Sequence, residues 1–197
     1  MANNWCTYNG KVIFFNGKSI SNSSKPVLPD NTVRIKYQAG YTPTMGDTQT
    51  LIDADENIWD IYTASNDWSG LFYVKSNLLE VIGANTSSVT DMRYMFQNCT
   101  SLTSVPLFDT SKAKDTRYMF RECTSLTSVP LFDTSSVTDM RDMFDGCFNV
   151  ESGALALYQQ ASSQATPPLL YDLCFRNCGR DTTTGAAELA QIPSDWK

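Results

Sequence analysis

The sequence predicts an α/β repeat protein: a short leucine-rich-repeat solenoid with a β-rich N-terminal cap and a helical C-terminal cap. The main observation is that Ser87–Val150 repeats with a period of about 24 residues, marked by Cys99, Cys123 and Cys147, and periods of roughly 20–29 residues are typical of leucine-rich repeats. Two hairpin signals precede the repeats, and a helical pattern follows them. One repeat cannot bury its own apolar face, so neighbouring repeats must stack.

Residues 1–65 are expected to form the β-rich cap. Asn9-Gly10 and Asn16-Gly17 lie between apolar runs, and Asn-Gly is the strongest short signal for a two-residue hairpin. Alternating or β-branched runs on either side of these and later turns predict short strands. The expected strands are Trp5–Tyr8, Lys11–Phe15, Lys18–Ile20, Thr32–Tyr37, Thr50–Asp53 and Ile58–Thr63.

The first half of each repeat has the pattern of a short helix. Ser88-Val-Thr-Asp91 fits a helix N-terminus, where a hydroxyl and an acid suit the free N–H groups and the dipole. The apolar residues that follow are spaced by three, four and three positions, which is typical of one helix face. These residues are Val89, Met92, Phe96 and Cys99. We therefore expect Phe96, Phe120 and Phe144 to stack in the core.

The second half of each repeat predicts a short strand. Leu102, Val105 and Leu107 form an L-x-x-V-x-L pattern, and Pro106 cannot donate to a sheet. Phe108 and its equivalent Phe132 are expected to fill the core. Asp-Thr-Ser then predicts a turn into the next repeat.

Both ends of the solenoid contain degenerate repeats, as expected where a stack must face something else. Leu71-Phe72 aligns with Met95-Phe96, and Phe175-Arg-Asn-Cys178 matches the segment that ends at Cys99. We predict a solenoid over residues 66–181 with a helical insertion near 151–168, where Ala154–Ser163 can form a helix. Residues 182–197 are the C-terminal cap, with a short helix over Ala186–Gln191.

The repeated string V-T-D-M-x-x-M-F-x-x-C-x-S-L-T-S-V resembles the repeat of the BspA-like leucine-rich-repeat surface proteins of bacteria. The resemblance covers about the central third of the chain clearly. It implies the solenoid fold, an extracellular or cell-surface location, and adhesion through protein binding. It does not imply catalysis.

Composition excludes several classes of function. The chain has no histidine, which excludes Ser-His-Asp and Cys-His catalysis and His-ligated metal sites. The formal net charge of −6 argues against nucleic acid as a partner. No run is long enough to span a bilayer, and the first ten residues lack the segments of a signal peptide. We expect no cofactor and no membrane insertion.

The cysteines are expected to be structural. Zinc ligands usually come in pairs two to four residues apart, whereas Cys99, Cys123 and Cys147 share the phase of the repeated core positions. They are therefore predicted to be buried, reduced thiols. Cys174 is an extra thiol beside Cys178, and a bridge from Cys174 to Cys6 stays possible.

One acidic segment partly resembles a calcium loop. Asp53-Ala-Asp55-Glu-Asn57 has the right start, but an EF-hand loop needs Gly at its sixth position and Glu at its twelfth. Ile58 and Ala64 stand there instead. We interpret the segment as an acidic turn and expect no metal site.

The candidate ligand-binding residues are expected on the side of the repeats away from the apolar face, where Arg93, Arg117 and Arg141 recur in phase beside Tyr94, Tyr118 and Asp142, and where Arg121 differs between repeats. They are Arg93, Tyr94, Arg117, Tyr118, Arg121, Arg141 and Asp142. One interpretation is a solvated stripe in which the arginines pair with Asp91, Asp115 and Asp139. The other is a binding surface, because Tyr and Arg dominate interface hot spots.

The function predicted from these features is a non-enzymatic, adhesin-like module that recognises a protein or glycan outside the cell. The alternative is a tail-associated receptor-binding or structural protein of a bacteriophage, at the virion surface. An N-terminus without a signal peptide favours this alternative. No constellation of residues supports an enzyme.

Overall fold

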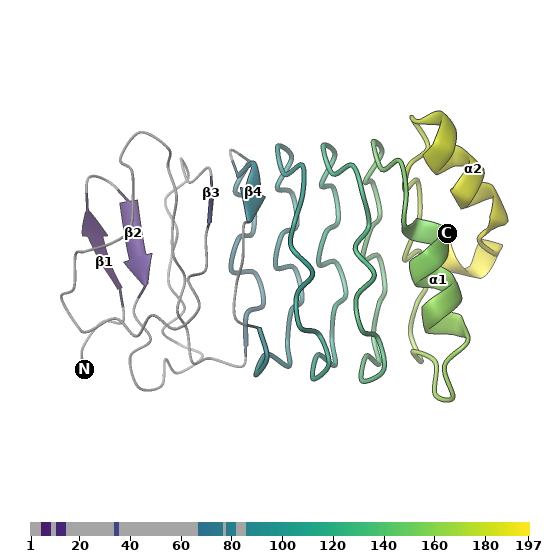
Figure 1. Cartoon of the computed structure of the whole chain (residues 1–197), viewed down its shortest axis with the longest axis horizontal. Helices are drawn as coiled ribbons and strands as arrows, with labels where there is room; N and C mark the ends of the chain where they lie inside the picture. The colour runs from purple at the N-terminus through teal and green to yellow at the C-terminus, as the bar shows by residue number, and fades with distance from the viewer. Residues whose placement is uncertain (1–4, 9–10, 15–33, 36–66, 77, 82–85) are drawn as a thin grey trace.

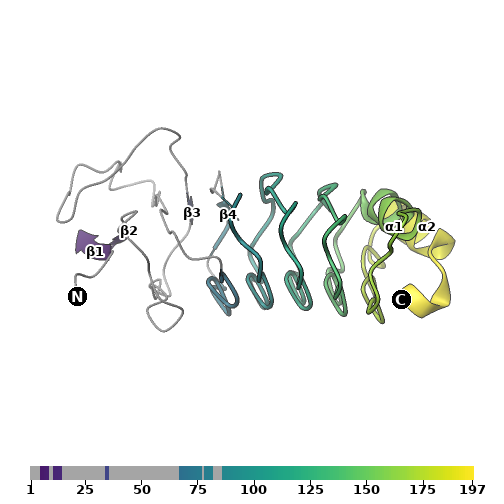
Figure 2. The ribbon, with the colours of Figure 1, turned by 90° about the horizontal axis from the view of Figure 1, so that it is seen from below.

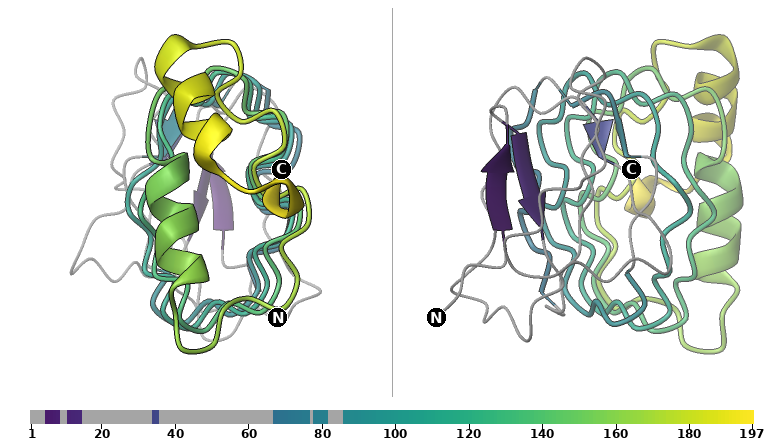
Figure 3. Two further views of the ribbon diagram at one scale, coloured as in Figure 1. Left: turned by 90° about the vertical axis from the view of Figure 1, so that its right-hand side faces the viewer. Right: turned by 60° about the vertical axis from the view of Figure 1, so that its left-hand side comes forward.

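The computed structural model describes residues 5–8, 11–14, 34–35, 67–76, 78–81 and 86–197. From residue 67 onward the chain winds into a stack of coils, with two α-helices at the C-terminal end (Figures 1 and 2). Seen along the stack, successive coils nearly superimpose (Figure 3). The predicted repeat solenoid is therefore the observed architecture.

Backbone hydrogen bonds join each coil to the next. The N–H of Tyr94 donates to the carbonyl of Arg117 at 3.1 Å, and the N–H of Tyr118 donates to that of Arg141 at 2.9 Å. Single parallel β-bridges mark the same register. They pair Asp67 with Asp91, Asp91 with Asp115, Asp115 with Asp139 and Asp139 with Leu170. The partners of the last bridge are further apart in the sequence than those of the others, because the segment that contains the insertion lies between them.

The predicted helix in the first half of each repeat is wrong: this half is a succession of turns. Tyr94 and Asn98 have φ values of 57° and 60°, which a right-handed helix cannot contain. The N–H of Gln97 bonds three residues back, to Tyr94, whereas the N–H of Phe96 donates to Met119 of the next coil. Turns that bond three residues back place inward side chains at intervals close to those of a helix face, which explains the misleading pattern.

The apolar residues of this half are buried as predicted. Val89, Met92, Phe96 and Cys99 have no exposed surface. Asp91, which we expected to begin a helix, instead accepts the N–H of Arg93 two residues on, as in an Asx turn.

The predicted strand of the second half is only partly correct. Leu102 and Phe108 are buried as expected, but Leu107 is 68% exposed and its equivalent Leu131 is 53% exposed. Phe108, immediately after Leu107, occupies the core at this point. In the regular coils this half pairs through isolated bridges, such as Ser128 with Ser152, rather than through a continuous ladder.

Stacked phenylalanines form the centre of the core. Phe96 lies between Phe72 and Phe120, with ring centroids 4.8 and 5.2 Å away. The column continues through Phe144 at 5.2 Å to Phe175 at 5.8 Å. Phe108 and Phe132 stack at 6.1 Å as a second column beside it. The predicted core column is confirmed.

The in-phase cysteines lie beside this column as free, buried thiols. The Sγ of Cys99, Cys123 and Cys147 donates to the carbonyl oxygens of Phe72, Phe96 and Phe120 at 3.0, 3.1 and 3.1 Å. Burial raises the pKa of Cys99 to about 12. Cys174 is also free and buried, so the possible bridge to Cys6 is not formed.

The N-terminal elements include three of the predicted strands: Trp5–Tyr8, Lys11–Phe15 without its last residue, and a two-residue part of Thr32–Tyr37. Strands β1 (Trp5–Tyr8) and β2 (Lys11–Phe14) form an antiparallel pair, and β3 (Arg34–Ile35) pairs in parallel with β4 (Glu80–Val81). The degenerate first coil is confirmed, because the N–H of Trp68 donates to the carbonyl of Asp91. The other predictions for the N-terminal cap, including the acidic turn at Asp53, lie outside the described residues.

Helices α1 (Ala154–Ser162) and α2 (Thr183–Gln191) form where the sequence predicted helices. They lie side by side against the end of the stack (Figure 3). The Glu188 carboxylate of α2 accepts the N–H groups of Gly153 and Leu155, and so caps α1. Gly153 has φ of 97°, and a Cβ there would lie 2.2 Å from the carbonyl oxygen of Val129.

A short 3₁₀ helix, Ser194–Trp196, completes the C-terminal end. Trp196 is buried, and its ring lies 4.3 Å from the ring of Tyr171 and 6.3 Å from that of Phe175. The predicted distorted last repeat is confirmed, because Phe175 continues the core column. Trp196 therefore closes the column against solvent.

Replacing Phe120 by Ala should lower the free energy of unfolding by about 3–5 kcal/mol, the usual cost of removing a large buried side chain. The ring is fully buried between Phe96 and Phe144. Urea denaturation followed by circular dichroism measures the loss. Leu131→Ala is the matched control on an exposed side chain and should stay within about 0.5 kcal/mol of the original protein. A loss below about 1 kcal/mol for Phe120→Ala would contradict the stacked core.

Candidate binding surface

One edge of the solenoid carries three parallel rows of side chains, which we call the turn face. Each row contains equivalent positions of successive coils. The rows are Ser69, Arg93, Arg117 and Arg141; Gly70, Tyr94, Tyr118 and Asp142; and Tyr73, Gln97, Arg121 and Asp145. All seven predicted ligand-binding residues lie in these rows. The hydrogen bonds between coils fix the spacing along each row.

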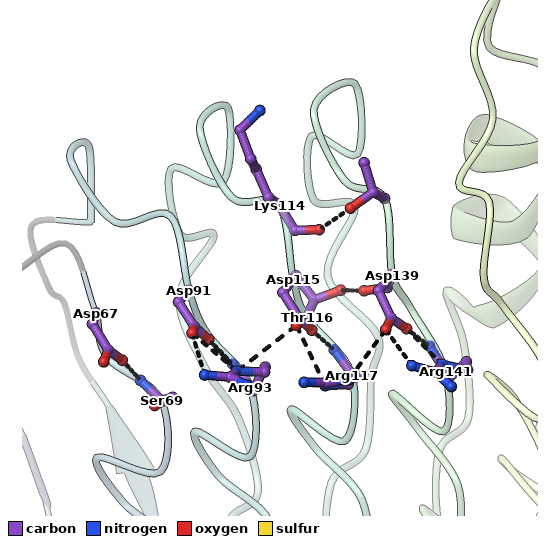
Figure 4. Close-up of polar contacts among 11 residues, drawn as sticks. Asp67, Ser69, Asp91, Arg93, Lys114, Asp115, Thr116, Arg117, Asp139 and Arg141 are labelled. Carbon is purple, nitrogen blue, oxygen red and sulfur yellow. Dashed lines mark hydrogen bonds and ion pairs between the residues drawn. The ribbon is translucent and has the colours of Figure 1, made fainter.

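The arginines of the first row are held by aspartates (Figure 4). The Nε of Arg93 donates to both carboxylate oxygens of Asp91 at 2.9 Å, and its Nη2 lies 2.7 Å from Asp91 Oδ2. Arg141 makes the same contact with Asp139, at 2.7 Å. Arg117 lies between two coils, 3.3 Å from Asp115 and 3.6 Å from Asp139. This geometry supports the paired-stripe interpretation of the arginines.

The carboxylates of the stripe differ in their pKa. Burial raises the pKa of Asp139, but the hydrogen bonds and charge of Arg141 outweigh it, and the net pKa is below the usual value. Burial also raises the pKa of Asp115, and here it prevails. The hydrogen bond that Asp115 accepts comes from the backbone N–H of Arg117, and its carboxylate lies between the charges of Asp91 and Asp139.

The tyrosines of the second row stack on each other. The rings of Tyr94 and Tyr118 have centroids 5.0 Å apart and are inclined by 5°. The guanidinium of Arg121 lies over the Tyr118 ring at 5.7 Å, within reach of a cation–π interaction. Tyr94 is 36% exposed, so the stack reaches the surface as a rigid aromatic ridge.

Asp145 is the buried centre of an ion-pair cluster that the sequence analysis did not identify. It is 2% exposed, and it accepts the Nε of Arg121 at 3.1 Å and the Nε and Nη2 of Arg176 at 2.8 and 2.6 Å. Burial raises its pKa, but the two arginines outweigh this and lower the net pKa. Asp142 lies 3.7 Å from Arg176, and burial followed by the nearby Asp145 charge raises its pKa. Two predicted ligand residues, Arg121 and Asp142, therefore belong to this network of ion pairs.

A hollow of about 390 Å³ opens where the tyrosine row begins. It is lined by Ser69, Gly70, Tyr73, Tyr94 and Gln97. Gly70 is the equivalent of Tyr94 in the preceding coil. It has no side chain, so it does not continue the stack of Tyr94 and Tyr118. The alignment of Leu71-Phe72 with Met95-Phe96 also places Gly70 in this row, so the sequence contains the signal for this position.

A second hollow, also about 390 Å³, lies at another edge of the coils beside α1. The exposed Leu107 and Leu131 line it together with Asp109, Asp133 and Gln160. The serine hydroxyl and N–H of Ser111 lower the pKa of Asp109. This hollow contains none of the predicted ligand-binding residues.

The described residues contain no group of three His, Cys, Asp or Glu side chains that could hold a metal ion. Among those residues, no helix is both long and apolar enough to cross a membrane. The turn face itself presents a stacked aromatic pair and fixed ion pairs.

Comparison with known proteins identifies one family model, described as a Mycoplasma protein of unknown function, DUF285, which matches residues 44–156. No curated protein matches the chain. A crystal structure of a leucine-rich repeat protein from Eubacterium ventriosum is similar at 16% sequence identity and a TM-score of 0.37. The match covers 89% of this chain and spans half the length of that protein.

Replacing Asp145 by Asn should lower the free energy of unfolding at pH 7 by about 1.5–3 kcal/mol, the range for hydrogen bonds to charged groups. The folded-state pKa of Asp145 is below its unfolded value of about 3.9. Its contribution is therefore complete above about pH 5 and is lost as the pH falls through the folded pKa. The difference between the two proteins should shrink from pH 7 to pH 3.

Urea denaturation at several pH values measures this difference. Asp172→Asn is the control, because this carboxylate is exposed, and it should change stability by less than about 0.5 kcal/mol. A deficit of Asp145→Asn that stays constant down to pH 3 would show that the ionised carboxylate is not the source of the stability.

Proposed function

The chain belongs to the family described as Mycoplasma proteins of unknown function, DUF285, and from this premise we propose that it is a non-enzymatic binding module. It recognises a protein or glycan through the turn face, in the manner of a surface repeat protein that acts outside the cell. The resemblance of its repeats to BspA-like surface proteins supports this location. The lack of histidine throughout the sequence supports a binding role rather than catalysis.

The observation that carries this proposal is the ridge of Tyr94 and Tyr118, stacked at 5.0 Å beside the arginine row. Tyrosine supplies a large amphipathic contact area with few rotatable bonds, and it is enriched in binding hot spots. Here the rings are already ordered by stacking. Binding through them therefore loses less conformational freedom than binding through mobile side chains.

The charges of the turn face indicate which net charge a partner should carry. Each arginine of the first row is paired with an aspartate, so the row is not a free cationic stripe. An acidic polymer would have to compete with Asp91, Asp115 and Asp139 for these guanidinium groups. The face is better suited to a neutral or mixed-charge partner that lies across several coils, because the rows repeat at about 5 Å, the spacing of neighbouring strands.

The opposite, strand-side edge is less suited to recognition. The hydroxyl of Thr103 donates to the carbonyl of Leu79 at 3.0 Å, and that of Thr127 donates to the carbonyl of Thr103 at 3.3 Å. These hydroxyl groups extend the bonding between coils. Thr103-Ser104 also returns unchanged as Thr127-Ser128, so this edge offers little chemical variety.

The proposal is tested by screening the protein on glycan and protein arrays and comparing two multiple variants with it. The first replaces Arg93, Tyr94, Arg117 and Tyr118 by Ala, and the second replaces Thr103, Ser104, Thr127 and Ser128 by Ala. Array ligands should lose at least tenfold in affinity with the first variant and change little with the second. Circular dichroism confirms that both are folded. A loss of affinity only in the second variant would place the site on the strand side. If neither array contained a ligand for the protein, the proposal would be overturned.

A further inference from the structure

The tyrosine row of the turn face begins at a position without a side chain, Gly70. The N–H of Gly70 donates to the carbonyl of Arg93 at 2.7 Å, just as the N–H of Tyr94 donates to that of Arg117 one coil later. The φ values of Gly70 and Tyr94 are 64° and 57°. Gly70 therefore has the same place and backbone conformation as the tyrosines that follow it. Tyr118 covers one face of the Tyr94 ring, and Gly70 brings no ring to the other.

The described residues around Gly70 are aromatic or neutral and polar. The hollow is lined by Ser69, Gly70, Tyr73, Tyr94 and Gln97, none of which has an acidic or basic side chain. Four of the five have a hydroxyl or amide group that can donate and accept hydrogen bonds. Tyr73 is 49% exposed, so its ring stands at the rim of the hollow. The site combines an aromatic surface with neutral polar groups.

We propose that this hollow is a saccharide subsite that binds the pyranose ring of a neutral sugar against Tyr94, in the place of the missing ring. The inference rests on the proposed function and names the ligand class at one point of the turn face. A pyranose ring has a face of C–H groups that stacks on an aromatic ring, and hydroxyls around its edge. Those hydroxyls match the hydroxyl and amide groups of Ser69, Tyr73 and Gln97.

An aromatic side chain of a protein partner would also stack on Tyr94, but it fits the rest of the hollow less well. It would displace water from the polar groups of the lining without returning hydrogen bonds, which costs free energy for each group. A charged sugar is disfavoured because none of the described residues that line the hollow carries a charged side chain. The volume of about 390 Å³ lies within the range of small-molecule sites, roughly 300–1,000 Å³.

The row itself supplies a test variant, Gly70→Tyr. Tyr94 and Tyr118 show that a tyrosine is accommodated at this position with φ near 60°, so the new ring should continue the stack and fill the hollow. The matched control is Ser104→Tyr, which adds the same side chain at an exposed position of the strand-side edge. Thermal unfolding followed by circular dichroism confirms that both variants are folded.

The measurement is saturation-transfer NMR with millimolar methyl glycosides of glucose, galactose, mannose and N-acetylglucosamine. The original protein and Ser104→Tyr should transfer saturation to the C–H protons of at least one sugar. Gly70→Tyr and Tyr94→Ala should lose at least four-fifths of that signal. Tyr94→Phe should keep most of it, because the ring face is retained.

Two outcomes overturn the subsite: no saturation transfer to any of the four sugars, or an undiminished signal in Gly70→Tyr. Either failure is distinguishable from failure of the proposed function. Suppose that an array ligand no longer binds the variant lacking both arginines and both tyrosines but still binds Gly70→Tyr. The turn face would then remain the binding surface, and only the sugar subsite would be refuted.

Discussion

Hydrogen bonds between equivalent backbone positions of successive coils are the constraint on which the rest of this structure depends. The N–H groups of Tyr94, Phe96 and Asn98 all donate to the coil that follows, at 2.8–3.1 Å. Because the bonds run along the stack, each side chain lies against its equivalents in neighbouring coils. The buried phenylalanine column and the exposed tyrosine ridge are two results of the same register. A helix in this half of the repeat would use these donors internally and separate the coils.

The same register brings like charges together, and the repeat compensates for this by its order of residues. An aspartate and an arginine stand two positions apart, so each Asp–Arg pair lies beside another pair rather than beside an unpaired charge. The compensation is uneven. Asp139 accepts side-chain hydrogen bonds from Arg141 and has a lowered pKa, whereas burial and two neighbouring carboxylates raise the pKa of Asp115. Identical motifs therefore do not produce identical electrostatics, because the partner comes partly from the next coil.

The sequence was sufficient to predict the features that are set by a residue's position within the repeat. These are the solenoid, the stacked phenylalanines, the buried thiols and the degenerate coils at Phe72 and Phe175. It was insufficient where the partner of a backbone group decides the conformation, as in the supposed helix of each repeat. One signal was present, since the position of Asn98 is occupied by Gly146 two repeats later, and both residue types tolerate a left-handed conformation. For the candidate site, the rows of Arg93 and Tyr94 followed from the repeat. The hollow did not, because it is defined by the side chain that Gly70 lacks.

Regular stacking also limits where a solenoid of this kind can recognise a ligand. In the middle of a row the side chains already contact their neighbours: Tyr118 covers a face of Tyr94, and the aspartates lie within ion-pair distance of the arginines. A ligand that competes for these groups gains only the difference between two similar contacts. Where the register is broken, a group loses its internal partner while its neighbours stay fixed in place. Gly70 is such a break in the turn face, and it leaves Tyr94 preorganised with space on one side. A degenerate coil can therefore have a role in recognition. It leaves an ordered side chain of the next coil without its usual intramolecular neighbour, so a ligand can occupy that place.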